Sequence, residues 1–492
     1  MASSSSSTSS APQTLSRYNL RGFATLPGDS TSGLLAGGVS GGGVIAETDA
    51  AYAKVRTPLE LANALVAANK KGTIKVIEIM NDLNLGWNEI GAEVQNLAST
   101  PFTAAAAPKL HPVLLKSGVS SMQISPKAGG LTIFSANGAT IRHANWSIRN
   151  THNIIIRNLK FDELWEWDEA SNGHYDKNNW DFFTIGVGGG RVHHVWIDHC
   201  TFTKSYDGII DTKGGASNIT YSWNTYIGDD GETNPNSFVR QQVNALEASK
   251  SSYPMYNFLR TRGFSVEDIV KILQGPDKTQ AIGELSKDSS NPLASVTFHH
   301  QYYLNTWDRL PRLAGGQAHN YNIYVDDTKV LAAKRLRKAR YDAMSAADQL
   351  SFTKNYSFDP PINGSISTED GALLVEKSVY VDTIWPLRNN QTDPSDPSYT
   401  GKILATDTVY VFHNEDGTTI NSRGSSTDAG SKLGPFQATI KPFSWNTANG
   451  AAPYSLPASA YDDPMSLLDV IKAGAGAGRL TWDRQNWLKT AY

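Results

Sequence analysis

A nine-residue pattern that recurs at irregular intervals constrains the fold of this chain more than any other feature. Each copy has apolar residues in its second and fourth places and an aromatic residue in its ninth. The clear copies are NIIIRNLKF (153–161), HVWIDHCTF (194–202), NITYSWNTY (218–226) and SVTFHHQYY (295–303), and looser copies are SVYVDT (378–383) and TVYVFHN (408–414). Apolar residues at every second position are typical of β-strands.

A strand unit that recurs with insertions of variable length predicts a solenoid in which successive coils stack on one another. The segments between the copies hold too few strong helix signals for alternating strand and helix units. We therefore predict an all-β fold, a right-handed parallel β-helix with long loops. A β-sandwich is the structural alternative, and the scarcity of hairpin turn signals disfavours it.

Two segments carry helix signals. Residues 57–72 combine a Thr cap, a Pro in the first turn and a final Gly, and the strand-like run KVIEI (75–79) follows them. Residues 231–292 break the repeat, and within them SVEDIVKILQ (265–274) has a Ser cap, an acidic first turn and apolar residues at helical spacing. We interpret 231–292 as an inserted helical segment, which either forms a wall of the site or is an excursion without a role there.

Composition and charge exclude several classes of function. The 492 residues carry a formal net charge of −3, so we expect no nucleic-acid partner. No apolar run is long enough for a membrane span, and the single cysteine, Cys200, excludes an internal disulfide. The Ser-rich residues 1–17 are expected to be disordered and lack the apolar core of a signal peptide. Residues 18–492 are expected to form one parallel β-helix domain.

Three carboxylates, those of Asp181, Asp207 and Asp211, lie within the single stretch Trp180–Tyr226. Turns between stacked strands can bring such side chains together, and converging carboxylates favour Ca²⁺, which takes about six to eight oxygen ligands. The spacing does not match the EF-hand loop. For each aspartate taken singly, capping a turn is the simpler interpretation.

The order of several motifs resembles a known family. HVWIDHCTF, DGIID (207–211), NITYSWNTY and VTFHHQYYLNTWDRLPR (296–312) follow one another as they do in the polysaccharide lyase family that contains the pectate lyases. The resemblance covers nearly the whole chain after the Ser-rich start. It includes GFAT (22–25), TPLELANAL (57–65) and VIKAGAGAG (470–478).

This resemblance implies a parallel β-helix that cleaves polygalacturonate, the demethylated form of pectin, by Ca²⁺-dependent β-elimination. By their positions in the motifs, the three residues that match calcium ligands are Asp181, Asp207 and Asp211. Arg309, the first Arg of RLPR, matches the catalytic arginine. Asp198 and His199 of WIDH match a structural motif, which we interpret as a hydrogen-bonded turn.

The implied chemistry suits these residue types. The C5 proton of a uronate lies next to its carboxylate, and a bound Ca²⁺ acidifies that proton by holding the developing charge. A base then removes the proton and the C4–O bond breaks. Arginine side chains have a pKa above about 12, so the role of base for Arg309 comes from the resemblance. The alternative is that Arg309 only clamps a substrate carboxylate.

Two positions depart from the family pattern and remove positive charge. The family has a lysine shortly after the NITYSWNTY-type strand, where our alignment places Gly231, and a second arginine in RxPxxR, where this chain has Ala314. The candidates for replacing these contacts are Arg312, Lys213, Arg240 and residues of the insertion. Trp180 is a candidate for stacking on a sugar ring, with a core position as the alternative.

We therefore expect a monomeric, secreted pectate lyase that requires Ca²⁺. The same chemistry on partly methylated pectin or another uronate polymer is a second hypothesis, which the two departures favour. A β-helix that binds pectin without cleaving it is a third, and the three aspartates together with Arg309 disfavour it.

Overall fold

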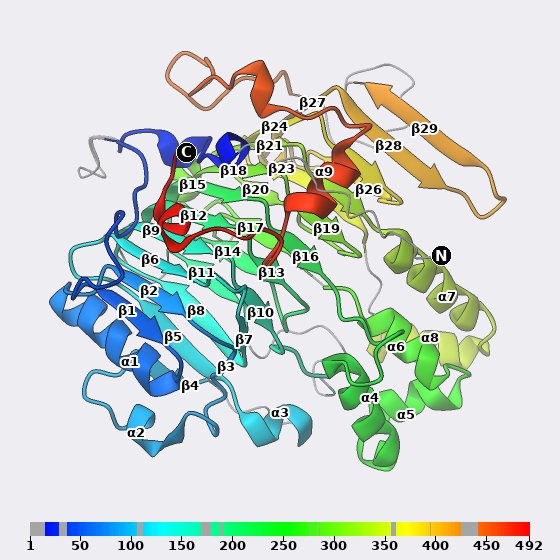
Figure 1. Ribbon diagram of the computed structural model, residues 1–492. Coiled ribbons are helices and arrows are strands. Elements are labelled where there is room, and N and C mark those ends of the chain that lie inside the picture. The colour runs from blue at the N-terminus through cyan, green and yellow to red at the C-terminus, as the bar shows by residue number, and fades with distance from the viewer. Residues whose placement is uncertain are drawn as a thin grey trace, which may run out of the picture.

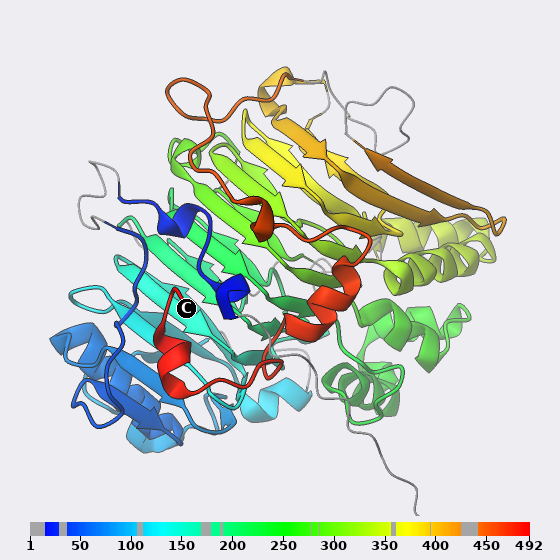
Figure 2. The same ribbon diagram turned by 45° about the horizontal axis from the view of Figure 1, so that its top comes forward.

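The chain folds into a parallel β-helix, in which three long sheets wind around one core (Figures 1 and 2). The computed structural model describes residues 15–28, 37–105, 112–167, 169, 179–186, 190–276, 278–284, 286–355, 361–393, 395–424 and 441–492. Within each sheet neighbouring strands run parallel, except that β4 pairs with β5 and β28 with β29 in the antiparallel sense. The predicted fold class is confirmed.

The sheets are named A, B and C, and each coil in the middle of the helix contributes in turn to all three. Sheet A contains β1 (Tyr52–Val55), β2 (Val76–Ile79), β6 (Leu131–Phe134), β9 (His152–Arg157), β12 (His193–Asp198), β15 (Ser217–Ser222), β18 (Ser295–His299), β21 (Gln317–Tyr321), β24 (Ala372–Glu376) and β27 (Lys402–Thr406). Sheet B contains β3 (Leu83–Asn84), β7 (Thr140–Arg142), β10 (Lys160–Asp162), β13 (Thr201–Phe202), β16 (Thr225–Ile227), β19 (Tyr302–Leu304), β22 (Tyr324–Asp326), β25 (Val379–Val381), β28 (Thr408–His413) and β29 (Thr419–Gly424). Sheet C contains β4 (Phe102–Ala104), β5 (Ser120–Ile124), β8 (Ala144–Ile148), β11 (Phe183–Ile185), β14 (Ile210–Thr212), β17 (Gln280–Ile282), β20 (Arg312–Ala314), β23 (Asn363–Thr368) and β26 (Trp385–Arg388).

The nine-residue pattern encodes a strand of sheet A, a sharp bend and a strand of sheet B. The sixth place of every clear copy has a left-handed backbone, with φ between 50° and 53° at Asn158, His199, Trp223 and His300. This conformation is uncommon for His and Trp. Ring stacking supports it, since Trp223 stacks on His300 with centroids 4.0 Å apart and lies over His199 at 5.9 Å.

The aromatic residues in the ninth place form a ladder inside the helix. Phe161, Phe202, Tyr226 and Tyr303 stack from coil to coil with centroid distances of 5.1, 5.4 and 4.8 Å. Each ring is at most 1% exposed, so the ladder removes a large apolar surface from water at every coil. The two looser copies are strands of sheet B, β25 and β28, which pair with each other.

Helices lie at the ends and flanks of this core. They are α1 (Pro58–Val66), α2 (Gly91–Gln95), α3 (Pro112–Ser117), α4 (Phe238–Ala248), α5 (Pro254–Thr261), α6 (Val266–Leu273), α7 (Thr328–Asp342), α8 (Ala346–Asn355), α9 (Leu467–Gly474) and α10 (Arg484–Leu488). The helix predicted near residue 57 is α1, with a capping box on Thr57, and Gly72 follows it in the left-handed conformation. The helix predicted at residue 265 is α6, with its capping box on Ser265. No described helix has the length and apolar character needed to cross a bilayer.

The insertion predicted at residues 231–292 ends earlier than predicted, and it packs against a second helical excursion that the sequence did not indicate. Residues 280–282 form β17, a regular strand of sheet C, so the insertion ends before Gln280. A later excursion forms α7 and α8, and α6 packs against both α4 and α7. These helices gather along one flank of the β-helix (Figure 2).

The two ends of the described chain meet on the outer surface of the β-helix. Of the Ser-rich tail, residues 1–14 lie outside the described residues, whereas Leu15–Tyr18 form a short 3₁₀ helix. This corrects the predicted boundary, because Arg17 pairs with Asp462 at 2.7 Å and Tyr18 packs against Trp223 at 4.8 Å. Cys200 is buried and free, as expected.

Candidate active site

Three strands of sheet C that lie side by side bring a carboxylate and a guanidinium onto one face. The strand register places Asp211 of β14 beside Ala281 of β17, and Ala281 beside Arg312 of β20 (Figure 1). Two strand spacings separate Asp211 from Arg312, or roughly 10 Å. The small side chain of Ala281 between them leaves the face open.

Asp211 and Arg312 line one cavity of about 630 Å³, together with Lys213, Arg309 and Asn179. Four of the predicted site residues, Asp211, Lys213, Arg309 and Arg312, thus come together from two coils, those of β14 and β20. The cavity also has Glu284 in its lining and therefore presents two carboxylates and three cations to a ligand, an excess of positive charge that suits a polymer carrying carboxylates.

The three aspartates meet around Gly208, in the bend that precedes β14. A Cβ atom built on Gly208 would lie 2.9 Å from Asp181 Oδ1 and 3.1 Å from Asp211 Oδ1. The backbone N–H of Gly208 donates a hydrogen bond to Asp181 Oδ1 at 2.8 Å. Glycine is thus the residue that leaves room for both carboxylates at this bend.

This arrangement has an excess of negative charge at its buried end. Burial, followed by the charges of Asp211 and Asp207, raises the pKa of Asp181 well above its usual value. Asp211 Oδ1 is buried and has no hydrogen-bond partner among the described residues. Hard oxygen donors with unmet negative charge fit a divalent cation such as Ca²⁺.

Lysines neutralise the other two aspartates. Lys278 contacts Asp207 Oδ1 at 2.5 Å, and Lys213 contacts Asp211 Oδ2 at 3.0 Å. Although burial acts in the opposite direction, Asp211 raises the pKa of Lys213. In the part of the chain that the structure describes, no three His, Cys, Asp or Glu side chains are already gathered around a metal position. The aspartates approach one another without forming a complete ligand set.

Arg309 lies in the bend before β20, with a left-handed backbone (φ 68°) and a cis peptide bond between Leu310 and Pro311 immediately after it. Its Nε atom is buried without a hydrogen-bond partner among the described residues and lies 3.9 Å from Asp308 Oδ2. Burial, with the charge of Arg309 as the second cause, lowers the pKa of Arg312. The two guanidinium groups therefore share one side of the cavity.

The remaining predicted residues lie elsewhere. Trp180 is 3% exposed, and its ring packs against Tyr206 at 5.4 Å, so burial favours the core position over stacking on a sugar. Arg240 pairs with Glu267 inside the insertion. Asp198 is fully buried, accepts a hydrogen bond from Arg157 and lies 2.7 Å from His199, as a structural turn would.

Lys278 is the site residue that the sequence analysis missed. It stands just before β17, one coil beyond Asp207, and the neighbouring backbone N–H of Thr279 donates to the carbonyl of Asp308. Alignment across the insertion placed the family's lysine at Gly231, because the helices α4–α6 separate the strand NITYSWNTY from β17.

Comparisons with known proteins show the family to which the chain belongs. Pectate lyase B of Paenibacillus amylolyticus is 46% identical over 382 residues, which are 77% of this chain and 90% of that protein. The solved structure of a pectate lyase from Paenibacillus sp. 0602 superposes with a TM-score of 0.85 and 46% identity, over 97% of this chain and all of the other.

A more distant structure, the thermostable pectate lyase PL 47, has a TM-score of 0.51 at 18% identity over 95% of this chain and supports the fold alone. No protein-family model matches the chain. The identity to pectate lyase B extends over most of both chains, and so this chain belongs to the pectate lyase family of polysaccharide lyases.

Proposed function

We propose that the protein is a calcium-dependent pectate lyase that cleaves polygalacturonate by β-elimination and releases unsaturated oligogalacturonides. The observation that carries this proposal is the cavity in which Asp211, Lys213, Arg309 and Arg312 face one another. A polyuronate offers carboxylates to the three cations, while Asp211 and the buried Asp181 supply oxygen donors for a cation.

The residues that would hold Ca²⁺ are Asp181, Asp207 and Asp211. Asp207 now contacts Lys278 at 2.5 Å; an Asp207 that held the ion instead would leave this lysine for a substrate carboxylate. When bound, the ion supplies positive charge that acidifies the C5 proton of the uronate. Lys213 and Arg312 orient the carboxylates of neighbouring sugars by charge-assisted hydrogen bonds.

Arg309 is the proposed base. In its neutral guanidine form, this side chain would take the C5 proton, the C5–H electron pair would form the C4–C5 double bond as the C4–O bond breaks, and water would protonate the departing oxygen. Its Nε atom has no hydrogen-bond partner among the described residues. Its ion pair in that part of the chain is a long one, with 3.9 Å between Nε and Asp308 Oδ2. Such a side chain is free to turn toward a substrate.

A second candidate function is the cleavage of partly methylated pectin. Ala314 stands where the family has an arginine, and Glu284 lines the cavity and accepts a hydrogen bond from the Gly214 N–H at 3.2 Å. An anionic side chain repels a free carboxylate and tolerates a neutral ester. A binding role without cleavage is the third possibility, and the experiment below distinguishes all three.

The test follows ultraviolet absorbance with polygalacturonate and with highly methylated pectin, each with calcium and with a chelator. We expect absorbance to grow on polygalacturonate and to be lost with the chelator and in Arg309→Ala, while Arg335→Ala, outside the cavity, retains activity. A faster rise in absorbance with methylated pectin than with polygalacturonate favours the second function. New reducing ends without absorbance indicate hydrolysis, and bound polymer without either signal indicates a binding protein.

We further propose that the enzyme acts outside the cell, since its proposed substrate is a cell-wall polymer. We also propose that it is a monomer. Gel filtration of the purified chain tests the oligomeric state, and activity assays on culture supernatant and cell fractions test the location.

A further inference from the structure

A row of outward-facing residues on sheet C runs from the candidate active site toward the first coils of the β-helix. The strand register pairs Asp211 with Thr184 of β11, and Thr184 with Ser147 of β8. Ser147 in turn pairs with Gln123 of β5. Thr184 and Ser147 are half-buried between buried neighbours and Gln123 is exposed, so these side chains share the outer face of the sheet. Three strand spacings separate Asp211 from Gln123, or roughly 14 Å.

A second cavity, of about 290 Å³, lies at the far end of this row and includes Ser147 and Gln123 in its lining. The lining contains no Asp or Glu. Its charged residues are Lys70 and Arg149, and most of the others carry hydroxyl or amide groups: Asn69, Ser99, Thr100, Thr103, Ser121 and Ser125. Such groups donate and accept hydrogen bonds, as the hydroxyl groups of a sugar require.

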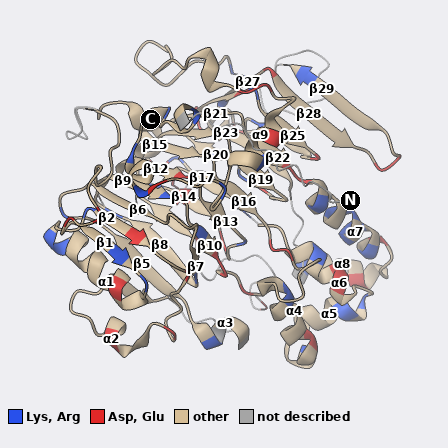
Figure 3. Ribbon diagram, viewed as in Figure 1, with Lys and Arg blue, Asp and Glu red and all other residues tan. Residues whose placement is uncertain are grey.

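The positive charge of this cavity is not neutralised by neighbouring acids. Arg149 Nε donates to Ser147 Oγ at 3.1 Å, and its Nη atoms have no hydrogen-bond partner among the described residues. Lys70 and Lys71 end the helical turn that continues α1, where blue marks basic residues in Figure 3. Within the part of the chain that the structure describes, Arg149, Lys70, Lys71 and the nearby Lys127 have no ion pair. The cavity therefore suits a polar ligand that carries negative charge.

We propose that this cavity is a distal subsite, in which Arg149 and Lys70 bind a carboxylate of the same polyuronate chain that occupies the candidate active site. The inference rests on the proposed function, because it requires a polymer with a carboxylate on each sugar. A chain that follows the row from Asp211 to Gln123 passes from one cavity to the other.

This arrangement makes binding depend on the length of the substrate. A pyranose unit is about as long as one strand spacing. Four sugars placed over Arg312, Ala281 and Asp211 therefore extend no further than Thr184 and do not reach Ser147. Polygalacturonate covers the whole row. Arg149 thus contributes to the binding of the polymer and not to that of a tetrasaccharide.

The test is steady-state kinetics of the full chain on polygalacturonate and on tetragalacturonate, followed by ultraviolet absorbance. We expect Arg149→Gln to raise the KM for polygalacturonate by about three- to tenfold and to leave kcat unchanged. Both constants for tetragalacturonate should stay at the wild-type values. Added salt should narrow the difference in KM, because it screens exposed charges. Lys70→Gln, at an exposed position, should act in the same direction without disturbing the fold.

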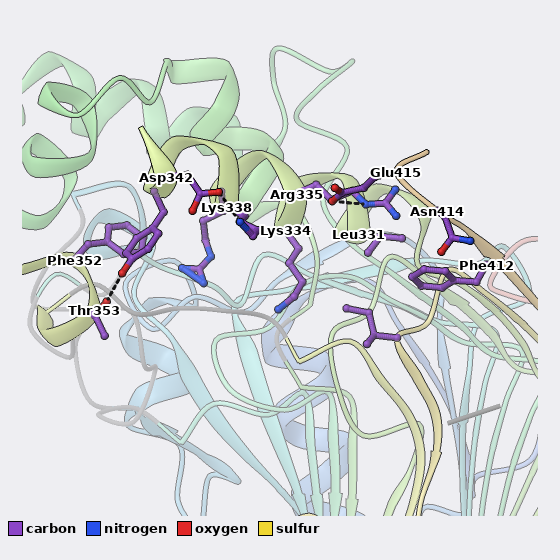
Figure 4. Close-up of a pocket in the computed structure, with 13 residues that line it drawn as sticks. Leu331, Lys334, Arg335, Lys338, Asp342, Phe352, Thr353, Phe412, Asn414 and Glu415 are labelled. Atoms are coloured by element: carbon purple, nitrogen blue, oxygen red, sulfur yellow. Dashed lines mark hydrogen bonds and ion pairs between the residues drawn. The ribbon is translucent and has the colours of Figure 1, made fainter. Parts of the chain in front are cut away.

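Arg335→Gln is the matched control. Arg335 lies on α7, lines a different cavity and pairs with Glu415 at 3.4 Å (Figure 4). This variant should match the wild type on both substrates. The distal subsite is overturned if Arg149→Gln and Lys70→Gln leave the KM for polygalacturonate unchanged, if the two substrates lose equally, or if Arg335→Gln has the same effect.

Failure of the proposed function gives a different result. A wild-type protein that produces no absorbance with either substrate is not a lyase, and calorimetric titration with the same two ligands then decides the distal subsite. Weaker binding of polygalacturonate by Arg149→Gln, with unchanged binding of tetragalacturonate, would support the subsite in a protein that binds pectin without cleaving it. Equal affinities of Arg149→Gln and the wild type for polygalacturonate would overturn it.

Discussion

At the scale of single residues, the bend around Gly208 decides whether the candidate cation site works. Asp181 lies behind Asp211 in the interior, where burial and two neighbouring charges raise its pKa. In the metal-free protein the folded state therefore holds the Asp181 proton more tightly than the unfolded state does. Stability from this group is present at low pH and is lost as the pH rises through the raised pKa.

Asp181→Asn removes the loss of stability that ionisation of Asp181 causes as the pH rises. The amide carries no charge and keeps an oxygen that accepts the hydrogen bond from the Gly208 N–H. We expect the variant to be more stable than the wild type at neutral pH in the presence of a chelator, by roughly 1–2 kcal/mol. Thermal unfolding across a pH series measures this, and the gap between the two proteins should narrow in acid.

Calcium supplies the control for this variant. A ligand that binds only the folded state stabilises by about 2.7 kcal/mol at a hundredfold excess over its dissociation constant. Calcium should raise the unfolding temperature of the wild type and leave that of Asp181→Asn nearly unchanged. Equal stabilisation of both proteins would place the cation elsewhere.

Gly208→Ala tests the room between the carboxylates. The new Cβ would lie within 3.1 Å of Asp181 Oδ1 and Asp211 Oδ1, which is closer than an ordinary contact, so one carboxylate must move. We expect calcium affinity to fall by at least about tenfold, since a loss of about 1.4 kcal/mol suffices for that. Calcium titration followed by calorimetry measures it. Gly37→Ala is the matched control, because a Cβ at Gly37 meets no atom within 4 Å.

At the scale of elements, the coils could be predicted from the sequence because their apolar spacing and ninth-place aromatics are local signals. The left-handed bends were not predicted. His199 and Trp223 disfavour that conformation on their own, and it persists because rings from successive coils stack over the bend. The clustering of Asp211, Arg309 and Arg312 is predictable only with the family pattern, since the register of sheet C comes from long-range pairing.

The aromatic ladder also supports the candidate site, through Gln280 of β17. Its side-chain amide donates to the Tyr226 hydroxyl at 2.7 Å and accepts from the Tyr303 hydroxyl at 2.6 Å. Its backbone N–H donates to the carbonyl of Arg309 at 2.9 Å. The residue therefore joins the core ladder to the bend that holds the proposed base.

Gln280→Met keeps the size of this side chain and removes its polar atoms. We expect a loss of roughly 2–4 kcal/mol of stability, since two buried hydroxyls lose their amide partner, and a lower kcat on polygalacturonate with little change in KM. Denaturant unfolding and steady-state kinetics measure the two effects. Adding Tyr303→Phe should recover part of the stability, because it removes one unpaired hydroxyl. Strict additivity of the two substitutions would contradict the linkage.

At the scale of the whole molecule, helical excursions limited what could be predicted. The helices α4–α6 separate two strands that are adjacent in sheet C, and this distance in sequence concealed Lys278. Helices α7 and α8 carry many charged residues and no clear apolar stripe, so their amphipathic signal is faint. Both excursions pack on one flank, a relation that arises only once the coils have stacked.

The two ends of the chain clamp the same side of the β-helix. Arg157, which is buried beside Asp198 at 2.7 Å, donates to the carbonyls of Trp487 and Lys489 at 3.1 and 2.7 Å. The Leu20 N–H donates to the carbonyl of Thr490 at 2.8 Å. We therefore propose that the chain from Leu15 to Tyr492 unfolds as one unit, and that the last residues belong to its core.

Removal of residues 487–492 tests this proposal. The truncation leaves the charge of Arg157 without its carbonyl partners. It also removes Trp487, which is fully buried in the intact chain, and so exposes the surface that this side chain covers. Arg157 keeps its ion pair with Asp198 but loses hydrogen bonds that are worth about 1.5–3 kcal/mol each for a charged donor, so the whole calorimetric transition should shift to lower temperature. Tyr492→Phe is the control, because it removes only the two hydrogen bonds of the Tyr492 hydroxyl, which accepts from Arg157 at 2.9 Å and donates to the carbonyl of Asn486 at 3.1 Å, and should cost about 1–2 kcal/mol. A truncated chain that unfolds at the wild-type temperature would show that the terminal segment is an appendage and that the unit ends before it.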